Sequence, residues 1–173
     1  MSRDTIPWRD LANSRGTALA PFPPSTIETL MIRPLSKSDL DAAVELWYQA
    51  SVKAHGFIPA EFWHAQRAAM RDIYLPASES WVYEEQGLLA GFISWHQGSV
   101  AALFIAPSLQ SQGLGRQLLD HLKSRHEQLE LTVYAENEPA RRFYARNGFH
   151  EGEQRICEHS GHAEIIMHWQ RGI

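Results

Sequence analysis

The sequence predicts an α/β fold, with a single mixed β-sheet of about seven strands flanked by about four helices. Two patterns lead to this prediction. Residues 81–85, 88–95 and 100–106 are strand-like segments separated by Gln-Gly turns, which is typical of an antiparallel meander. Residues 100–106, 114–122 and 129–135 then alternate as strand, helix and strand, which is typical of two parallel strands joined by a crossover helix.

Two helices are expected between a first strand and the meander. The first strand covers residues 31–35, and Ser38-Asp39 then caps an amphipathic helix that ends before Gly56. Pro59 suits the first turn of the second helix, and Pro76 is expected to break it.

The chain is expected to finish with a helix and a hairpin. Apolar residues recur at helical spacing over residues 140–147, and Gly148 closes this helix. Residues 149–158 and 163–170 are predicted to form the terminal hairpin.

Composition predicts one domain that follows a flexible extension. Prolines cluster over residues 21–24 after a segment without an apolar period, so we expect an extension over 1–29 and the domain over 30–173. An alternative is that translation starts at Met31.

The net charge of −4 provides no general attraction to nucleic acid. The arginines over residues 141–146 are interpreted as a solvated helix face.

Cysteine usage and hydropathy predict a cytoplasmic protein. Cys157 is the only cysteine, so it cannot form an internal disulfide. The first residues are charged, and no apolar run approaches the roughly 18 residues that a membrane-spanning helix needs. We therefore expect no membrane segment, and either a monomer or a homodimer.

The segment from Gln110 to Arg116 has the strongest functional signal. Its glycines, Gly113 and Gly115, fall in the first turn of the helix over 114–122. Backbone amides in a first turn have no intrahelical partner and lie at the positive end of the helix dipole, so they can bind an anion such as a phosphate. The spacing matches neither the dinucleotide-binding motif nor the nucleotide P-loop.

Two segments of the chain resemble motifs of the GNAT superfamily of acetyl-CoA-dependent N-acetyltransferases. One is Gln110-x-x-Gly113-x-Gly115. The other is Asn137-x-x-Ala140-x-x-Phe143-Tyr144-x-x-x-Gly148-Phe149. The resemblance covers residues 31–170, and residues 54–58, 81–85 and 101–107 more closely resemble small bacterial members of the YiaC and YjaB type.

The resemblance implies a GNAT fold in which strands 4 and 5 splay apart to admit acetyl-CoA, the cosubstrate. Amides of the turn would hold the pyrophosphate, the edge of the fourth strand would bind the pantetheine arm, and Asn137 would reach the same arm or cap the last helix. The implied cofactor-binding residues are Leu103, Phe104, Ile105, Gln110, Gln112, Gly113, Leu114, Gly115, Arg116, Asn137, Ala140 and Phe143.

The resemblance also implies that Tyr144 is catalytic, as a proton or hydrogen-bond donor to the departing thiolate. A phenol with a pKa near 10 is a weaker acid than a thiol near 8.5, so full proton transfer is uphill by roughly 2 kcal/mol. A hydrogen bond to the thiolate can therefore suffice. The alternative is a tyrosine that only packs beside Phe143.

The amine acceptor needs a base or a desolvating pocket. An amine with a pKa near 10.4 is only about one part in 2,500 neutral at pH 7, and deprotonation costs roughly 4.6 kcal/mol. Candidate bases are His55, His96 and Glu136, and each is also explained as a surface or loop residue. His55, Phe57 and Trp63 are candidates for the acceptor pocket.

The pair of histidines in His159-Ser160-Gly161-His162 suggests a metal site, but the segment lacks a third ligand at a suitable spacing and is typical of a hairpin turn. We expect no metal.

The predicted function is direct acetyl transfer from acetyl-CoA to a primary amine, on a protein lysine or a small molecule, in a ternary complex. The alternatives are a non-catalytic acyl-CoA sensor or interaction module, and a toxin-type enzyme that acetylates aminoacyl-tRNA.

Overall fold

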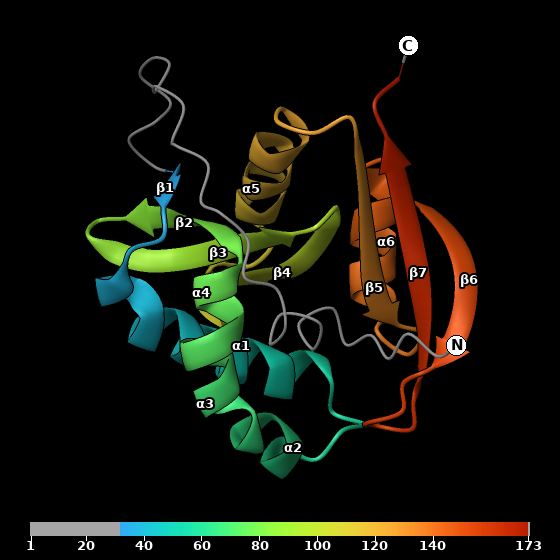
Figure 1. Cartoon of the computed structure of the whole chain (residues 1–173), viewed down its shortest axis with the longest axis horizontal. Helices are drawn as coiled ribbons and strands as arrows, with labels where there is room; N and C mark the ends of the chain where they lie inside the picture. The colour runs from blue at the N-terminus through green and yellow to red at the C-terminus, as the bar shows by residue number, and fades with distance from the viewer. Residues whose placement is uncertain (1–31, 173) are drawn as a thin grey trace.

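The computed structural model describes residues 32–172, so the predicted extension over 1–29 and the alternative start at Met31 lie outside the described residues. The strands within this range are β1 (Ile32–Pro34), β2 (Glu79–Glu85), β3 (Leu88–His96), β4 (Ser99–Ile105), β5 (Gln128–Tyr134), β6 (His150–Ile156) and β7 (Ala163–Gln170). They form one seven-stranded sheet in the order β1-β2-β3-β4-β5-β7-β6 (Figure 1). Neighbouring strands are antiparallel except β4 and β5, which are parallel. The predicted mixed sheet is confirmed.

The helices lie before the meander, between β4 and β5, and between β5 and β6. They are α1 (Leu40–Ala54), α2 (Ala60–Ala65), α3 (Arg67–Ala69), α4 (Leu75–Ala77), α5 (Leu114–Lys123) and α6 (Glu138–Arg146). Short 3-10 turns, η3 (Lys37–Asp39) and η5 (Pro107–Leu109), precede α1 and follow β4, and a π-helical turn, η4 (Met70–Tyr74), joins α3 to α4.

The predicted start of the first helix is confirmed, since α1 begins at Leu40 with Asp39 as its N-cap residue. The 3-10 turn η3, which directly precedes α1, has Ser36 as its own N-cap residue, and the Ser36 N–H donates to Asp39 Oδ2 at 2.7 Å. The predicted end of the second helix at Pro76 is wrong by about two residues. Pro76 does not break the second helix, because it occupies the first positions of α4 after the π-helical turn. A proline is tolerated there, since the first amides of a helix lack an intrahelical acceptor.

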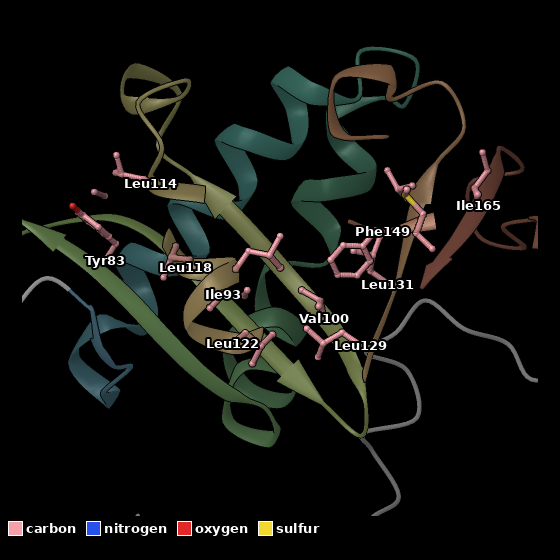
Figure 2. Packing of buried hydrophobic residues seen from close by; sticks show 14 residues of the cluster. Tyr83, Ile93, Val100, Leu114, Leu118, Leu122, Leu129, Leu131, Phe149 and Ile165 are labelled. Atoms are coloured by element: carbon pink, nitrogen blue, oxygen red, sulfur yellow. The ribbon is translucent and has the colours of Figure 1, made fainter. Parts of the chain in front are cut away.

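Helices cover both faces of the sheet with separate apolar cores. On one face, buried leucines of α5, including Leu118 and Leu122, pack against Ile93, Val100 and Leu131 of the strands (Figure 2). On the other face, Trp47 of α1 and Trp63 of α2 pack against Val82, Phe92 and Ala102. The two cores hold the sheet between α5 and α6 on one side and α1 to α4 on the other.

The turns of the meander are the predicted Gln-Gly pairs. Gln86 and Gly87 have φ angles of 51° and 76°, and Gln97 and Gly98 have φ angles of 46° and 90°. Two consecutive residues with positive φ are typical of the tight turns that connect antiparallel strands. No helix within residues 32–172 is both long enough and apolar enough to cross a membrane.

Candidate active site

The sheet opens between β4 and β5 toward the carboxyl ends of these strands. Their parallel register contains a single pair of residues, Ser99 with Glu130, where the Glu130 N–H donates to Gly98 O at 3.1 Å. Beyond this pair, β4 continues along β3 as far as Ile105, and β5 continues along β7 as far as Tyr134. The splaying of strands 4 and 5 is therefore confirmed.

The second half of β4 forms an unpaired edge beside this opening. Leu103, Phe104 and Ile105 are half-buried, and within the described residues no strand pairs with them on the side of β5. The side-chain amide of Gln110 donates to Ile105 O at 3.2 Å. Backbone groups along such an edge can bind an extended chain that carries its own amides.

The glycine turn leads from β4 into α5. Gly113 is the N-cap residue, with φ of 86°, and Ser111 also has a positive φ, of 64°. Gln117 N–H donates to Gly113 O at 3.1 Å. The amides of residues 114–116 precede this bond and have no carbonyl one turn earlier, so they can bind an anion. Gln112 and Arg116 are exposed beside them, and Arg116 pairs with Asp120 at 3.5 Å.

The two glycines of the turn are required for different structural reasons. A Cβ atom at Gly113 would meet no other atom within 4 Å, so this glycine is required by its backbone conformation alone. A Cβ atom at Gly115 would lie 3.3 Å from the Phe143 ring. Gly115 thus allows a close approach of α5 to α6, which brings the turn next to the helix that carries Tyr144. Leu114 contributes a core side chain, since it is only 6% exposed.

Tyr144 lies on α6 between two aromatic rings. Its ring centroid is 5.2 Å from that of Phe143 and 5.6 Å from that of Phe149. The hydroxyl forms no hydrogen bond with any residue that the structure describes. Burial raises the pKa of Tyr144 above its ordinary value. The side chain is therefore a neutral phenol at physiological pH, with a proton available for a hydrogen bond.

Asn137 and His55 form a buried hydrogen-bonded pair that joins the start of α6 to the end of α1. Asn137 Oδ1 accepts from the Ala140 N–H at 3.3 Å, so Asn137 is the N-cap of α6, and its Nδ2 lies 3.3 Å from His55 Nε2. His55 Nδ1 donates to Ser51 O at 3.0 Å. Burial lowers the pKa of His55, and both of its ring nitrogens have partners, so it is a neutral structural link.

Aromatic rings gather beside this pair. The aromatic cluster consists of His55, Phe57, Trp63, Tyr134 and His162, with ring centroids 5.0 to 6.5 Å apart in the contacting pairs. Figure 1 shows the loop after α1 meeting the loop between β6 and β7 at this place. Trp63 is only 3% exposed and stacks behind His55, whereas Phe57 is half-buried. Of the predicted pocket residues, Phe57 is thus the one that faces outward.

Two members of this cluster, Tyr134 and His162, were not predicted from the sequence, and His162 was considered only as a metal ligand. His162 Nδ1 lies 2.7 Å from Glu136 Oε2. The ladder between β5 and β7 extends one residue past β5, where the Ala135 N–H donates to Ala163 O at 2.8 Å. If this register continues by one more residue, positions 136 and 162 are the next pair to face each other. The register of the two strands is the signal that could have found the pair, and the sequence does not specify it.

The structure does not bring His96 to this region. It lies at the turn between β3 and β4, opposite Ser99, and its Nδ1 is 3.2 Å from Ala77 O. This turn is at the amino end of β4, whereas the glycine turn follows the carboxyl end. Of the three predicted bases, Glu136 and His55 therefore lie near the opening of the sheet, and His96 does not.

Comparison with known proteins shows which class of protein shares this fold. A family model described as an acetyltransferase (GNAT) domain matches residues 45–170. The peptidyl-lysine N-acetyltransferase YiaC of Escherichia coli K12 is 41% identical over 121 residues, which cover 69% of this chain and 83% of YiaC. The peptidyl-lysine N-acetyltransferase YjaB of the same organism is 30% identical, over 69% of this chain and 82% of YjaB.

Solved structures agree with these relatives. The solution structure of apo YjaB from Escherichia coli matches with a TM-score of 0.71 and 26% identity, over 80% of this chain and 95% of that chain. The fold is also shared with yncA of Salmonella typhimurium, a putative acetyltransferase solved with its cofactor acetyl-CoA, with a TM-score of 0.57 and 20% identity over 82% and 94% of the two chains.

The fold, with its sheet open beside a helix-terminal turn, is thus that of an acetyltransferase domain. The chain belongs to the GNAT family of acetyltransferases. It is an N-acetyltransferase, an enzyme that transfers an acetyl group to an amine.

Proposed function

We propose that this enzyme transfers the acetyl group of acetyl-CoA to the ε-amino group of lysine residues in proteins or peptides. The YiaC and YjaB relatives, which are named for this activity, support the acceptor. The structural observation that carries the proposal is the opening between β4 and β5, which has the glycine turn on one face of the sheet and the aromatic cluster on the other. A donor bound on the first face can present its thioester through the opening to an amine on the second.

On the donor side, the backbone of residues 112–116 holds the pyrophosphate of acetyl-CoA. The pantetheine arm runs along residues 103–105, where Leu103 and Ile105 present their amides and carbonyls to the opening, because those of Phe104 lie on the side of β3. Asn137 uses one Nδ2 proton toward His55 and has a second one that can reach the arm. Phe143 and Ala140 pack against the core beside this path.

At the reacting centre, Tyr144 donates a hydrogen bond to the sulfur as the thiolate departs. Because burial raises the pKa of Tyr144, complete proton transfer to sulfur is more unfavourable than for an ordinary phenol. A hydrogen bond to developing negative charge requires no such transfer, and it stabilises the transition state more than the ground state.

On the acceptor side, the chemistry of the aromatic cluster suits a lysine side chain. The half-buried Phe57 ring offers apolar surface to the methylene groups, and aromatic faces attract an ammonium group. The carboxylate of Glu136, which is half-exposed, adds negative charge at the rim.

We also propose that the enzyme works in the cytoplasm, as a monomer or a homodimer. One cysteine, Cys157, which is buried and unpaired, is consistent with a reducing compartment.

The test is release of CoA thiol from acetyl-CoA by the full chain, with peptides that share one sequence and differ in the amine that they offer. One peptide has an internal lysine and a blocked N-terminus, one has a free N-terminus and no lysine, and spermidine serves as a small-molecule amine. We expect the lysine peptide to give the highest kcat/KM, with the acetyl group located on the ε-nitrogen by mass spectrometry. Preferential turnover of the N-terminal amine or of spermidine would overturn the proposed acceptor.

A further inference from the structure

The pair of His162 and Glu136 has the geometry of a general base and its orienting carboxylate. Glu136 Oε2 is 2.7 Å from His162 Nδ1, and a carboxylate can only accept, so Nδ1 carries the proton. The lone pair of the neutral ring then lies on Nε2, which forms no hydrogen bond with any described residue. The His162 side chain is 30% exposed, so this nitrogen is accessible.

The backbone of the β6–β7 loop holds the His162 ring in place. His162 O accepts from the Cys157 N–H at 2.9 Å, and the His162 N–H donates to Ser160 Oγ at 3.3 Å. The ring itself lies 5.0 Å from Phe57, centroid to centroid, and 6.5 Å from Tyr134. The imidazole is therefore positioned by hydrogen bonds and ring contacts before any acceptor binds.

The other predicted bases are less suited to accept a proton at this place. His55 has partners on both ring nitrogens, and His96 lies at the far end of β4. The Glu136 carboxylate is already engaged with His162 Nδ1, and carboxylates in general are weaker bases than imidazoles, by about two pKa units. An imidazole with a bonded Nδ1 and an open Nε2 meets the requirement for a base that works near neutral pH.

We propose that His162 is the general base that deprotonates the acceptor amine, and that Glu136 is a positioning residue that orients its ring. This inference rests on the proposed function and adds a role for two residues of the acceptor side. The acceptor ammonium group loses one proton to His162 Nε2, which becomes an imidazolium ion. The amine lone pair then forms the C–N bond to the thioester carbonyl carbon, and the C–S bond breaks with its electron pair on sulfur. The second amine proton ends on the thiol, and the imidazolium ion returns its proton to water.

Other titratable groups surround the ring and enter the interpretation of any pH dependence. Glu136 contacts it from the segment between β5 and α6, and Tyr134 faces it from β5. His55 lies one ring further away, in contact with Phe57 and Tyr134. The β6–β7 loop itself carries Glu158 and His159.

The test compares His162→Gln with His168→Gln in the full chain. His168 is a matched control, because it also lies beside a glutamate. Its Nδ1 is 3.6 Å from Oε2 of Glu130, which belongs to β5, and this pair lies toward the other end of the ladder between β5 and β7. We expect His162→Gln to lower kcat/KM by about 100-fold or more at pH 7, with an unchanged thermal midpoint and an unchanged Kd for acetyl-CoA. His168→Gln should retain wild-type kcat/KM.

Two further readouts separate a base from a structural residue. The loss in His162→Gln should shrink as pH rises, because solvent then deprotonates the amine. It should also be smaller for a peptide with thialysine, whose amine is less basic than that of lysine. The Glu136→Gln variant should show a smaller fall in kcat/KM than His162→Gln. The Glu136→Asp variant should retain a higher kcat/KM than Glu136→Gln.

The proposal is overturned if His162→Gln retains kcat/KM at pH 7, or if its loss is the same at every pH and for both peptides. The pH comparison is made with whichever amine the wild-type enzyme turns over fastest. If the fastest amine is not a lysine, the proposed acceptor is refuted. The pH comparison with that amine still tests whether His162 is the base.

Discussion

Tyr144 and Asn137 lie on one helix and have distinct roles at the level of single residues. The Tyr144 hydroxyl has no partner among the described residues, whereas both functional groups of the Asn137 amide are engaged. A hydroxyl without a partner contributes little to stability, and a buried amide with two partners contributes much more. Substitutions at the two positions should therefore affect different measurements.

Replacing Tyr144 by Phe should lower kcat while the fold is retained. The ring contacts with Phe143 and Phe149 remain, and the proposed donor to the departing thiolate is lost. We therefore expect a fall of about 100-fold in kcat, within the range for acid–base groups. The thermal midpoint and the Kd for acetyl-CoA should stay at their wild-type values. Since burial raises the pKa of Tyr144, this contribution should not titrate below about pH 10. Full turnover by the variant across this range would show that Tyr144 only packs.

Replacing Asn137 by Ala should destabilise the protein by about 2 kcal/mol, since α6 loses its N-cap and the buried His55 Nε2 loses its donor. Urea unfolding followed by circular dichroism measures this difference. Asn137→Asp is the matched control, because it retains the capping oxygen and lacks the donor to His55, so its cost should be smaller. If the alanine variant unfolds at the wild-type urea concentration, the pair with His55 does not stabilise the fold.

At the level of elements, the turn before α5 combines two demands on glycine. Gly113 needs a left-handed backbone, and Gly115 needs a small side chain beside Phe143. The first requirement belongs to the start of α5, where the first amides lack an intrahelical acceptor, and the second brings α5 close to α6. The pattern of two glycines therefore sets the backbone of the proposed anion site and allows this site to lie close to the helix that carries Tyr144.

Replacing Gly113 by Ala should cost about 1 to 2 kcal/mol of stability, because φ of 86° is unfavourable for a residue with a Cβ atom, even though the space around it is open. Unfolding in urea measures this cost, and the KM for acetyl-CoA should rise in the same variant. Gly113→Asn should be milder, since asparagine tolerates this conformation. Equal costs for the two substitutions would exclude backbone conformation as the cause.

At the level of the whole molecule, the sheet consists of two antiparallel halves that meet in one parallel pair of residues. The strands β1 to β4 form one half, and β5, β7 and β6 form the other. The core around the α5 leucines contains residues of both halves, such as Ile93 of β3 and Leu131 of β5, and so holds the halves together (Figure 2). A ligand in the opening would contact both halves, so its binding should be detectable along the unpaired edge of β4.

Hydrogen exchange measured by mass spectrometry should show this directly. We expect coenzyme A to slow exchange of amides in residues 103–105 and 112–116, because the ligand supplies partners that the described chain does not. Peptides from β6, at the far edge of the sheet, serve as the internal control and should not change. Slower exchange at β6 without any at residues 103–105 would place the ligand elsewhere.

Much of this architecture was predictable from local patterns. The strands of the meander, the leucine-rich α5 and the Gln-Gly turns follow from period, turn chemistry and helix signals that act within a few residues. Pro76 was misread as the end of the second helix, whereas it occupies the first turn of α4, directly after the π-helical turn. The role of Gly115 was also invisible, since Phe143 lies on another helix.

The sequence by itself determined the class of fold, the order of its elements, the position of the glycine turn and the motifs that resemble an acetyl-CoA-dependent acetyltransferase. These features depend on residues that are near one another in the chain. Only the tertiary structure decided which side chains meet on the acceptor side. His55 and Asn137 are 82 residues apart, and Glu136 and His162 are 26 apart. Such contacts follow from strand register and from the packing of α1 and its following loop, which arise when the whole sheet assembles and leave no local pattern in the sequence.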